Sequence, residues 1–417
     1  MEKKSTIYIV GAGVSGLVAA LYLEKQGYAP IILEASGSVG GRVQTDLFNG
    51  YQLDHGFQVL LEAYPKAKEY LDYDALALQS FKPGAVLYKD GASQKIGDPL
   101  RDISLLFPTL FASVGSLADK WKIFKLNRYL SSKTMDAIFK EKEITTLEYL
   151  QNKGFSDKII ASFFKPFFSG IFLETELSTS SRMFEFVYKM FGEGLATLPK
   201  AGIGAIPDQL AAKLERTKLK YDTHVVSIRD QEIILANGET LTSDYTIIAT
   251  EASAIIPNLN NQETRWKRCE NLYFEVPTPK IKSAIIGLVT DSGALINNIF
   301  YHDSIGMTHS GEHSLLSVTV VKEHNLAHQA LVDQVISELG SLCNIHQVSF
   351  LKKYTITKAL PELDNLQYEV KPSETQLSQH IFLAGDVQLN GSLNAAMMAG
   401  ETAARGVLEK LEGGTLS

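Results

Sequence analysis

The sequence predicts an α/β fold with a parallel sheet of the Rossmann type, because it opens with a strand, a glycine-rich turn, a helix and a second strand. Residues 6–10 are apolar or β-branched, as expected of a strand buried on both faces of a parallel sheet. Residues 17–27 are rich in alanine and leucine and end at a glycine, which predicts a helix. Residues 30–33 predict the second strand, and Glu34 follows it.

The turn between the first strand and the helix has the spacing Gly-x-Gly-x-x-Gly of a dinucleotide-binding turn. Gly11 permits the tight turn, Gly13 lets the backbone approach a pyrophosphate, and Gly16 allows the helix to pack closely. Val14 and Ser15 lie at the helix N-terminus, whose free N–H groups and positive dipole end favour phosphate. A glycine-rich turn that binds no ligand is the alternative.

The residues after the second strand favour FAD over NAD. The Glu34 carboxylate can accept hydrogen bonds from two ribose hydroxyls and would repel a 2′-phosphate, which excludes NADP. After Ala35 the chain forms a loop containing Gly40, Gly41 and Arg42, where an NAD-binding domain would continue into another helix. This loop can fold back over the pyrophosphate, and Arg42 offers a fork of donors for a phosphate or a flavin oxygen.

Composition limits the other classes of protein. A length of 417 residues predicts two or more domains. The chain has 45% hydrophobic and 21% charged residues, a composition that is sufficient to form a buried core. The net charge of −7 makes nucleic acid an unexpected partner. Cys269 and Cys343 have no CxxC spacing, which favours a reducing compartment and no metal site. The first apolar run reaches glycine too soon for a signal peptide or a membrane span, so we expect a cytoplasmic protein.

These motifs resemble the FAD-binding signature of the flavin amine oxidase superfamily, which includes monoamine and polyamine oxidases, protoporphyrinogen oxidase and phytoene-type desaturases. A further match is residues 50–57, Gly-Tyr-Gln-Leu-Asp-His-Gly-Phe, which resemble the element that runs under the flavin ring in desaturases and protoporphyrinogen oxidases. The resemblance implies that Gly56 and Phe57 contact the flavin. It also implies bound FAD, which we expect to be noncovalent because neither cysteine precedes the last motif closely.

The last motif begins with a buried strand that ends in Gly385 and Asp386. Asp386 is thereby placed at the carboxyl edge of the sheet, where it can bind ribityl hydroxyls. A helix of small residues starting near Ser392 or Leu393 would direct its N-terminal amides at the N1–C2=O edge of the flavin, where reduction leaves negative charge. The resemblance adds Leu393 and Asn394 as flavin contacts. An alanine-rich core helix behind an unrelated aspartate is the alternative.

The middle of the chain predicts a hairpin followed by a strand. Residues 221–226 and 232–235, the turn at 236–239 and the run 245–250 have the pattern of these elements. In the family this insert completes the dinucleotide-binding domain, and the position of Val225 touches adenine through its backbone. A hairpin with a purely structural role predicts the same pattern.

The resemblance implies a discontinuous FAD-binding domain and an interleaved α+β substrate domain. We predict the FAD-binding domain from residues 1–75, 200–255 and 365–417. We predict the substrate domain from residues 76–199 and 256–364.

The predicted substrate domain contains many phenylalanines. They concentrate in residues 162–173 and 184–191, where helical spacing is typical of a buried core. The family has a similar Pro-Phe-x-x-Gly-Ile-Phe element at the start of its substrate domain, which implies a large apolar pocket. Residues 198–207 resemble the glycine turn that returns the chain to the flavin.

An apolar stretch at residues 103–117 is interrupted by a proline and followed by Lys120, Lys122, Lys125 and Arg128. It is too short to span a bilayer. It can be a lid, an interfacial helix that gives peripheral membrane contact, or part of the core.

The sequence assigns no catalytic residue. His55 lies within the flavin-proximal element and is the histidine we would test, but the interpretation we favour has its side chain turned away from the ring. The pairs His309 and His313, and His324 and His328, lack a third ligand, so we expect surface or packing roles and no metal. Lys282 and Lys358 are both candidates for the flavin-facing lysine of amine oxidases. Hydride transfer to flavin N5 needs no protein base if the substrate is aligned.

The function we predict is FAD-dependent dehydrogenation of a hydrophobic small molecule by hydride transfer to N5, with oxygen or a quinone as acceptor. The Asp54-His55-Gly56 element and residues 359–361, Ala-Leu-Pro, resemble protoporphyrinogen oxidases and desaturases. A flavin amine oxidase is an alternative, as is a catalytically silent flavin-binding or chaperone-like protein.

Overall fold

The computed structural model describes residues 5–97, 115–259, 262–307 and 311–413. Most of the apolar stretch, residues 103–114, lies outside this part of the chain. Among the helices of the described residues, none is long and apolar enough to cross a bilayer.

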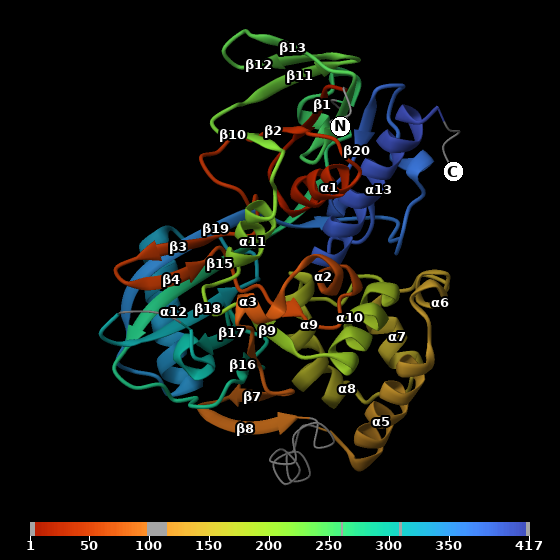
Figure 1. The fold of residues 1–417 in the computed structure, drawn as a ribbon. Helices are drawn as coiled ribbons and strands as arrows, with labels where there is room; N and C mark the ends of the chain where they lie inside the picture. The colour runs from red at the N-terminus through yellow and green to blue at the C-terminus, as the bar shows by residue number, and fades with distance from the viewer. Residues whose placement is uncertain (1–4, 98–114, 260–261, 308–310, 414–417) are drawn as a thin grey trace.

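A five-stranded parallel sheet lies in the upper part of the molecule (Figure 1). Its strands, in spatial order, are β10 (Lys218–Lys220), β2 (Ile31–Leu33), β1 (Ile7–Val10), β14 (Tyr245–Ile248) and β20 (Ile381–Leu383). All four residues of the central β1 are buried, as predicted for a strand covered on both faces. The sheet therefore combines strands from the start, the middle and the end of the chain. Because the strands are parallel, their carboxyl ends lie at the same edge of the sheet.

Two helices cover this sheet and pack against each other: α1 (Val14–Lys25) and α13 (Leu393–Leu411). Helix α1 begins three residues before the predicted start, directly after Gly13. Helix α13 begins where predicted, and the Ser392 hydroxyl caps it by accepting the N–H of Ala395 at 3.0 Å. A Cβ on Gly400 of α13 would overlap the carbonyl oxygen of Ser15, so the two helices cross too closely for any side chain.

The central insert differs from the predicted hairpin. It forms a three-stranded antiparallel sheet of β11 (Val225–Arg229), β12 (Glu232–Leu235) and β13 (Thr240–Thr242). The predicted strand at residues 221–226 is wrong, because Asp222 adopts a left-handed conformation with φ +50° and separates β10 from β11. The predicted turn at residues 236–239 is present, and it joins β12 to β13.

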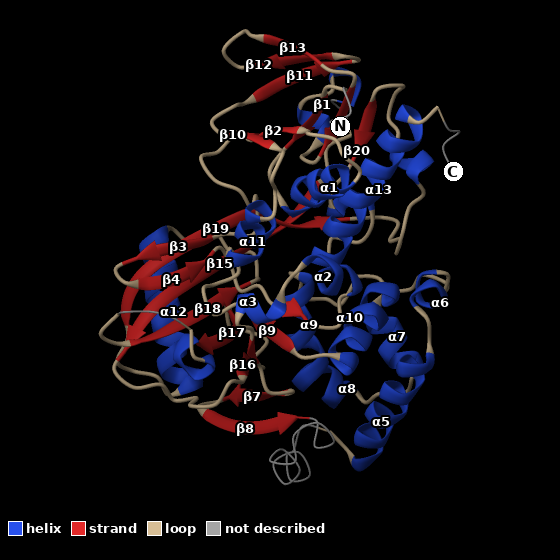
Figure 2. Ribbon diagram, viewed as in Figure 1, coloured by secondary structure: helices blue, strands red, loops and turns tan. Residues whose placement is uncertain are grey.

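A seven-stranded mixed sheet lies at the lower left of the molecule (Figure 2). Its order is β19 (Ser349–Glu362), β15 (Arg265–Val276), β18 (Ser314–Val320), β17 (Ile296–Tyr301), β16 (Ile286–Val289), β7 (Gly84–Lys89) and β8 (Ala92–Gly97). Only the β16–β7 pair is parallel. Helix α12 (His328–Cys343) packs on β7 and β8.

Most of the remaining helices gather at the lower right (Figure 2). They are α5 (Leu117–Ser132), α6 (Met135–Phe139), α7 (Thr146–Asn152), α8 (Asp157–Ile159), a π-helical turn (Ile160–Phe164), α9 (Lys165–Phe172) and α10 (Ser181–Glu193). Phe164, Phe168 and Phe184 are fully buried among them. Helix α9 also packs on β16 and β17, which joins this helical region to the mixed sheet.

Short elements connect the three regions. They are the hairpin β3 (Thr45–Phe48) and β4 (Tyr51–Asp54), the small sheet β5 (Leu60–Leu61), β9 (Ala196–Leu198) and β6 (Gln79–Ser80), and the helices α2 (Pro65–Tyr70), α3 (Tyr73–Leu76) and α11 (Ala205–Ala212). Five 3-10 turns complete the described part: Ala252–Ala254, Pro257–Leu259, His302–Ile305, Pro372–Thr375 and Asp386–Gln388.

Candidate functional site

A continuous cavity of about 1350 Å³ runs from the parallel sheet to the helical region. This volume exceeds the usual range of ~300–1,000 Å³ for a single small-molecule site, so there is room for two molecules. We call the part beside the first glycine turn the glycine end. Its lining includes Gly11, Gly13, Val14, Ser15, Glu34, Gly40, Gly41, Arg42, Gly56, Phe57, Gly385, Asp386 and Leu393. Thirteen of the predicted site residues are therefore brought together here.

The glycine end shows where a ligand would approach the backbone. Gly13 has an ordinary φ of −69°, and a Cβ built on it would meet no heavy atom within 4 Å. Neither backbone conformation nor packing explains a glycine there, whereas a phosphate resting on the backbone would. Gly40 lies beside this turn, because its N–H donates to the Ala12 carbonyl at 2.9 Å. The two glycine loops thus form one cradle.

Glu34 stands at the end of β2, beside the first turn. Its carboxylate accepts the N–H of Ala12 at 2.7 Å and both the N–H and the hydroxyl of Ser36, at 2.9 and 2.8 Å. A carboxylate has about four acceptor positions. One position therefore stays available for a hydroxyl donor such as a ribose, and the backbone bonds hold the side chain in place.

Arg42 and Asp386, from opposite ends of the chain, form an ion pair in the cavity wall. The Arg42 guanidinium also lies 4.9 Å from the ring centre of Trp266, the second residue of β15. Sequence analysis did not identify Trp266, because it carries no motif and is placed by the long β15 strand. Ser15 supports the same wall by accepting the N–H of Gly385 at 2.9 Å.

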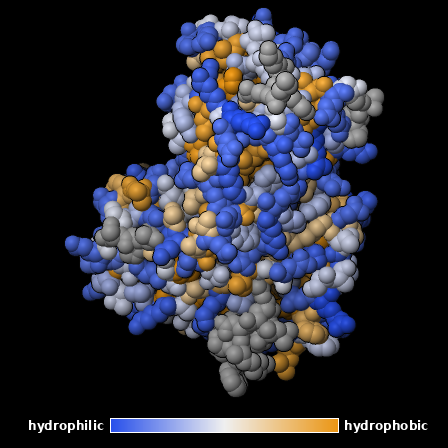
Figure 3. Space-filling model, in the orientation of Figure 1, coloured by the Kyte–Doolittle hydropathy of each residue, from blue (hydrophilic) through white to orange (hydrophobic). Residues whose placement is uncertain are grey.

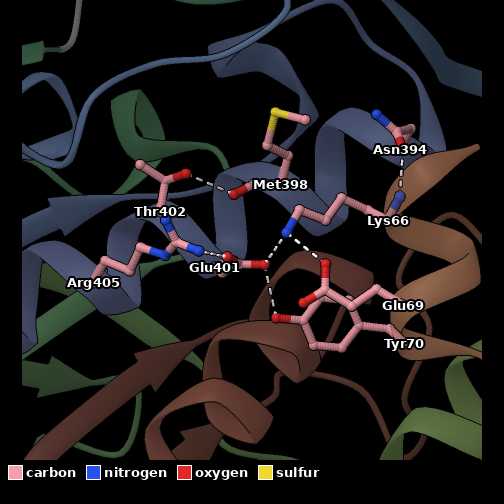
Figure 4. Close-up of polar contacts among 8 residues, drawn as sticks. All are labelled: Lys66, Glu69, Tyr70, Asn394, Met398, Glu401, Thr402 and Arg405. Carbon is pink, nitrogen blue, oxygen red and sulfur yellow. Dashed lines mark hydrogen bonds and ion pairs between the residues drawn. The ribbon is translucent and has the colours of Figure 1, made fainter.

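Four predicted contacts do not line the cavity: Gly16, Ala35, Val225 and Asn394. A Cβ on Gly16 would overlap the carbonyl oxygen of Gly11, so this glycine has a packing reason of its own. Val225 is buried in β11. The Asn394 carbonyl oxygen accepts the backbone N–H of Lys66 at 3.0 Å (Figure 4). Their roles in ligand binding stay predictions.

The Lys66 side chain also takes part in a polar network between α2 and α13, which sequence analysis missed. Its ammonium pairs with the buried Glu401, and Tyr70 donates to the same carboxylate at 2.9 Å (Figure 4). Arg405 pairs with Glu401 from one turn further along α13. Although burial alone would raise it, the pKa of Glu401 is lowered by the hydrogen bonds from Lys66 and Tyr70. The network therefore holds a buried carboxylate in its charged form.

The other part of the cavity, which we call the phenylalanine end, lies between α5, α9, α10 and the mixed sheet. Its apolar lining includes Phe163, Phe167, Ile171, Val187 and Phe191. The rings of Phe163 and Phe167 stack with centres 5.5 Å apart. The predicted phenylalanine-rich region thus supplies both the buried core of the helical region and the wall of this cavity.

Polar groups are sparse at the phenylalanine end. Asn298 lines it and donates to Thr319 at 3.2 Å. Cys269, which pairs with Ile356 in the mixed sheet, also lines the cavity, and burial raises the pKa of its thiol to about 12, so the thiol stays protonated. Of the two candidate lysines, Lys358 lines the cavity and pairs with Glu251, whereas Lys282 does not line it.

His55 lines the cavity next to Gly56, and its side chain is oriented by two neighbours. Nε2 lies 3.1 Å from the Asp46 carboxylate, and the ring packs on Tyr354 with centres 4.6 Å apart. The preceding Asp54 is buried and accepts the Thr45 hydroxyl at 2.6 Å. Burial raises the pKa of Asp54 to about 6.

Of the two histidine pairs, the structure describes His313, His324 and His328. His324 lies 3.0 Å from the Glu270 carboxylate, and His328 packs on Phe350. His309 lies outside the described residues. Within the part of the chain that the structure describes, no group of three or more metal-ligating side chains occurs.

Comparisons with known proteins show which family this chain matches. A family model described as flavin-containing amine oxidoreductase matches residues 14–408. Protoporphyrinogen oxidase 2 of Arabidopsis thaliana is 30% identical over 168 residues, which cover 39% of this chain and 32% of that protein. An L-amino acid oxidase of Cerastes cerastes is 26% identical over 272 residues, covering 60% of this chain and 51% of that protein. The matches thus span about a third and a half of these relatives.

A solved structure extends the likeness to the whole fold. An oxidoreductase from Methanosarcina mazei superposes with a TM-score of 0.74 at 14% sequence identity, covering 97% of this chain and all of that one. At this identity the likeness is evidence for the fold alone. The open cradle at Gly13 and the available acceptor position on Glu34 are compatible with a bound dinucleotide such as FAD.

Proposed function

Because this chain belongs to the flavin-containing amine oxidoreductase family, we propose that it is an FAD-dependent enzyme that dehydrogenates a hydrophobic small molecule. FAD is its cofactor, and the bound flavin supplies the two-electron chemistry by accepting hydride at N5. The observation that carries the proposal is the single cavity, which has a nucleotide cradle at one end and a wall of phenylalanines at the other. Protoporphyrinogen oxidases and desaturases are the subclasses we favour.

The residues of the glycine end would hold the cofactor. The backbone at Gly13 would receive the pyrophosphate, Glu34 a ribose hydroxyl, and Asp386 the ribityl chain. The Arg42 guanidinium already neutralises Asp386 in the wall, so it limits the negative charge near the phosphates. The N-terminus of α13, capped by Ser392, would direct its dipole at the flavin.

The phenylalanine end would select and orient the substrate. Its aromatic wall excludes water and favours an apolar molecule. Among the described residues that line the whole cavity, the only carboxylates are Glu34, Glu251 and Asp386. Two of them are paired with Lys358 and Arg42, and the third lies at the glycine end. A cationic amine would therefore lack a counter-ion beside the phenylalanines, which favours an uncharged or anionic substrate over a polyamine.

Anaerobic mixing of the FAD-loaded protein with candidate substrates tests this proposal. A porphyrinogen, a polyene and putrescine are each added, and the visible absorption of the oxidised flavin is followed. We expect bleaching with the porphyrinogen or the polyene. Bleaching with putrescine alone would assign the chain to the amine oxidases. If dithionite bleaches the flavin but none of the three compounds does, the silent flavin-binding protein is favoured.

A further inference from the structure

Helix α5 exposes large apolar side chains on the face that points away from the protein. Leu117, Trp121 and Phe124 are 75%, 57% and 39% exposed, and their spacing of four and three residues places them on one face. The opposite face buries Leu126 and Leu130, and α5 packs there against α10. The inner face is enough to hold α5 in the fold. Within the part of the chain that the structure describes, α10 is the element that packs closely on α5, and it does so on the inner face.

The charges on the same outer face are basic. Lys125 and Arg128 are exposed, and the Lys125 ammonium lies 5.6 Å from the ring centre of Trp121. The helix has one acidic residue, Asp119, which is buried and accepts hydrogen bonds from Ser116 and Ser156. The chain as a whole has a net charge of −7, so the charge of this basic face is opposite in sign to the net charge of the chain. In Figure 3, hydrophobic and charged side chains lie side by side over this lower right part of the molecule.

The outer face of α5 is continuous with the cavity. Trp121 and Phe124 stack with ring centres 5.3 Å apart, and both also line the phenylalanine end. Lys120, between them and the helix start, lines it as well. A hydrophobic molecule that leaves a surface in contact with α5 would thus enter the cavity without crossing water.

We propose that the outer face of α5 binds the surface of an anionic lipid bilayer. Aromatic and leucine side chains with flanking lysine and arginine are the composition of helices that lie in the membrane interface. At 1.5 Å per residue, the 16 residues of α5 extend about 24 Å, and they would lie along the surface because their inner face is occupied. Binding to lipid does not depend on the proposed function. The role of the bilayer as a source of substrate rests on that proposal.

The fluorescence of Trp121 provides a direct test. The chain contains two tryptophans, so the W266F variant, loaded with FAD, leaves Trp121 as the only one. Vesicles of phosphatidylcholine with and without phosphatidylglycerol are added. We expect a blue shift of the emission and quenching by brominated acyl chains, both with the anionic vesicles. Raising the salt concentration to 1 M should weaken the binding, since the screening length falls to about 3 Å.

Paired variants of the FAD-loaded protein separate the charges from the apolar contacts in vesicle sedimentation. K125E/R128E should reduce partitioning into anionic vesicles at least about 30-fold, because about 1 kcal/mol is lost for each basic residue removed and the added carboxylates are repelled. The double variant L117S/F124S should reduce partitioning into the same vesicles about tenfold or more. The controls are K25E/K218E, which makes the same change of charge at the far end of the molecule, and L47S, which removes an exposed leucine from β3.

Two results would overturn the proposal. One is equal partitioning of the wild type and K125E/R128E. The other is a Trp121 emission that is already blue-shifted without lipid and does not respond to vesicles, which would mean that protein covers the helix. Neither measurement requires turnover, so a failure of the substrate test leaves this result intact, and the reverse also holds.

Discussion

The two ends of the cavity are built in different ways. The glycine end is made by short segments, most of which follow a strand of the parallel sheet, and its backbone shapes the site. The phenylalanine end is made by side chains of helices and strands that are far apart in the chain. The comparison indicates that backbone conformation determines cofactor binding, whereas side-chain packing determines the space for the substrate. Four experiments test this distinction.

The largest effect is expected from alanine at two neighbouring glycines of the first turn. G16A should prevent folding, because its Cβ would overlap the backbone carbonyl of Gly11. G13A should fold with a free energy of unfolding within about 1 kcal/mol of the wild type, since φ is ordinary and space is open. It should weaken FAD binding at least about tenfold, by filling the cradle. Soluble yield, urea unfolding of the apoprotein and FAD titration measure these effects. Normal FAD affinity of G13A would contradict the cradle.

The same distinction explains what the sequence could predict. Strand β1, the first turn and α13 were predicted because their signals are local: a buried run, glycine spacing and a run of small residues. The start of β11 was missed, because the left-handed Asp222 depends on tertiary context.

The partners of individual side chains could not be predicted from the sequence. Arg42 and Asp386 were each predicted near the nucleotide, but their pairing joins residues 344 positions apart. Trp266 and the Lys66–Glu401 pair depend in the same way on the packing of distant elements. The division of the phenylalanines between core and wall also follows from packing, since their spacing is helical in both cases.

Two adjacent phenylalanines of α9 test the other end of the cavity. Phe168 is fully buried, whereas Phe167 lines the cavity. F168A should lower the free energy of unfolding by about 3–5 kcal/mol through loss of burial and an unfilled space. F167A should cost about 1–2 kcal/mol, because its ring faces an existing cavity. Urea unfolding at saturating FAD measures both, and equal losses would show that the cavity wall is ordinary core.

Asp54 should give the pH dependence of stability, near the junction of the two ends. Its pKa is raised by burial from 3.8 to about 6, so the native state keeps a proton that the unfolded state releases. The contribution of this group is therefore fully present below about pH 4 and falls by about 3 kcal/mol as the pH rises through 6. D54N, which cannot ionise, should gain stability relative to the wild type over this range.

Urea unfolding of both proteins between pH 4 and 7.5, at saturating FAD, measures this difference. Other titrating groups cancel, because they are common to the two proteins. Parallel curves would mean that the pKa of Asp54 is the same in the native and unfolded states, and any constant offset between them would then reflect only the added amide of the asparagine.

The smallest effect is expected from the polar network between α2 and α13. K66M removes one partner of the buried Glu401 but leaves Arg405 and Tyr70 (Figure 4). We expect a loss of about 2 kcal/mol at neutral pH, which is less than the ~3–5 kcal/mol for a fully isolated buried charge. The exposed pair of Lys140 and Asp136 is the matched control, and K140M should cost below about 0.5 kcal/mol.

The double variant K66M/E401L decides why the loss occurs. If the loss comes from leaving a buried carboxylate poorly compensated, replacing that carboxylate as well should restore stability to within about 1 kcal/mol of the wild type. If the loss comes from packing of the lysine stem, the double variant should be less stable than K66M. Restoration would mean that the network contributes little to the free energy of unfolding. Its main role would then be to position α2 against α13, and with it the backbone around Asn394.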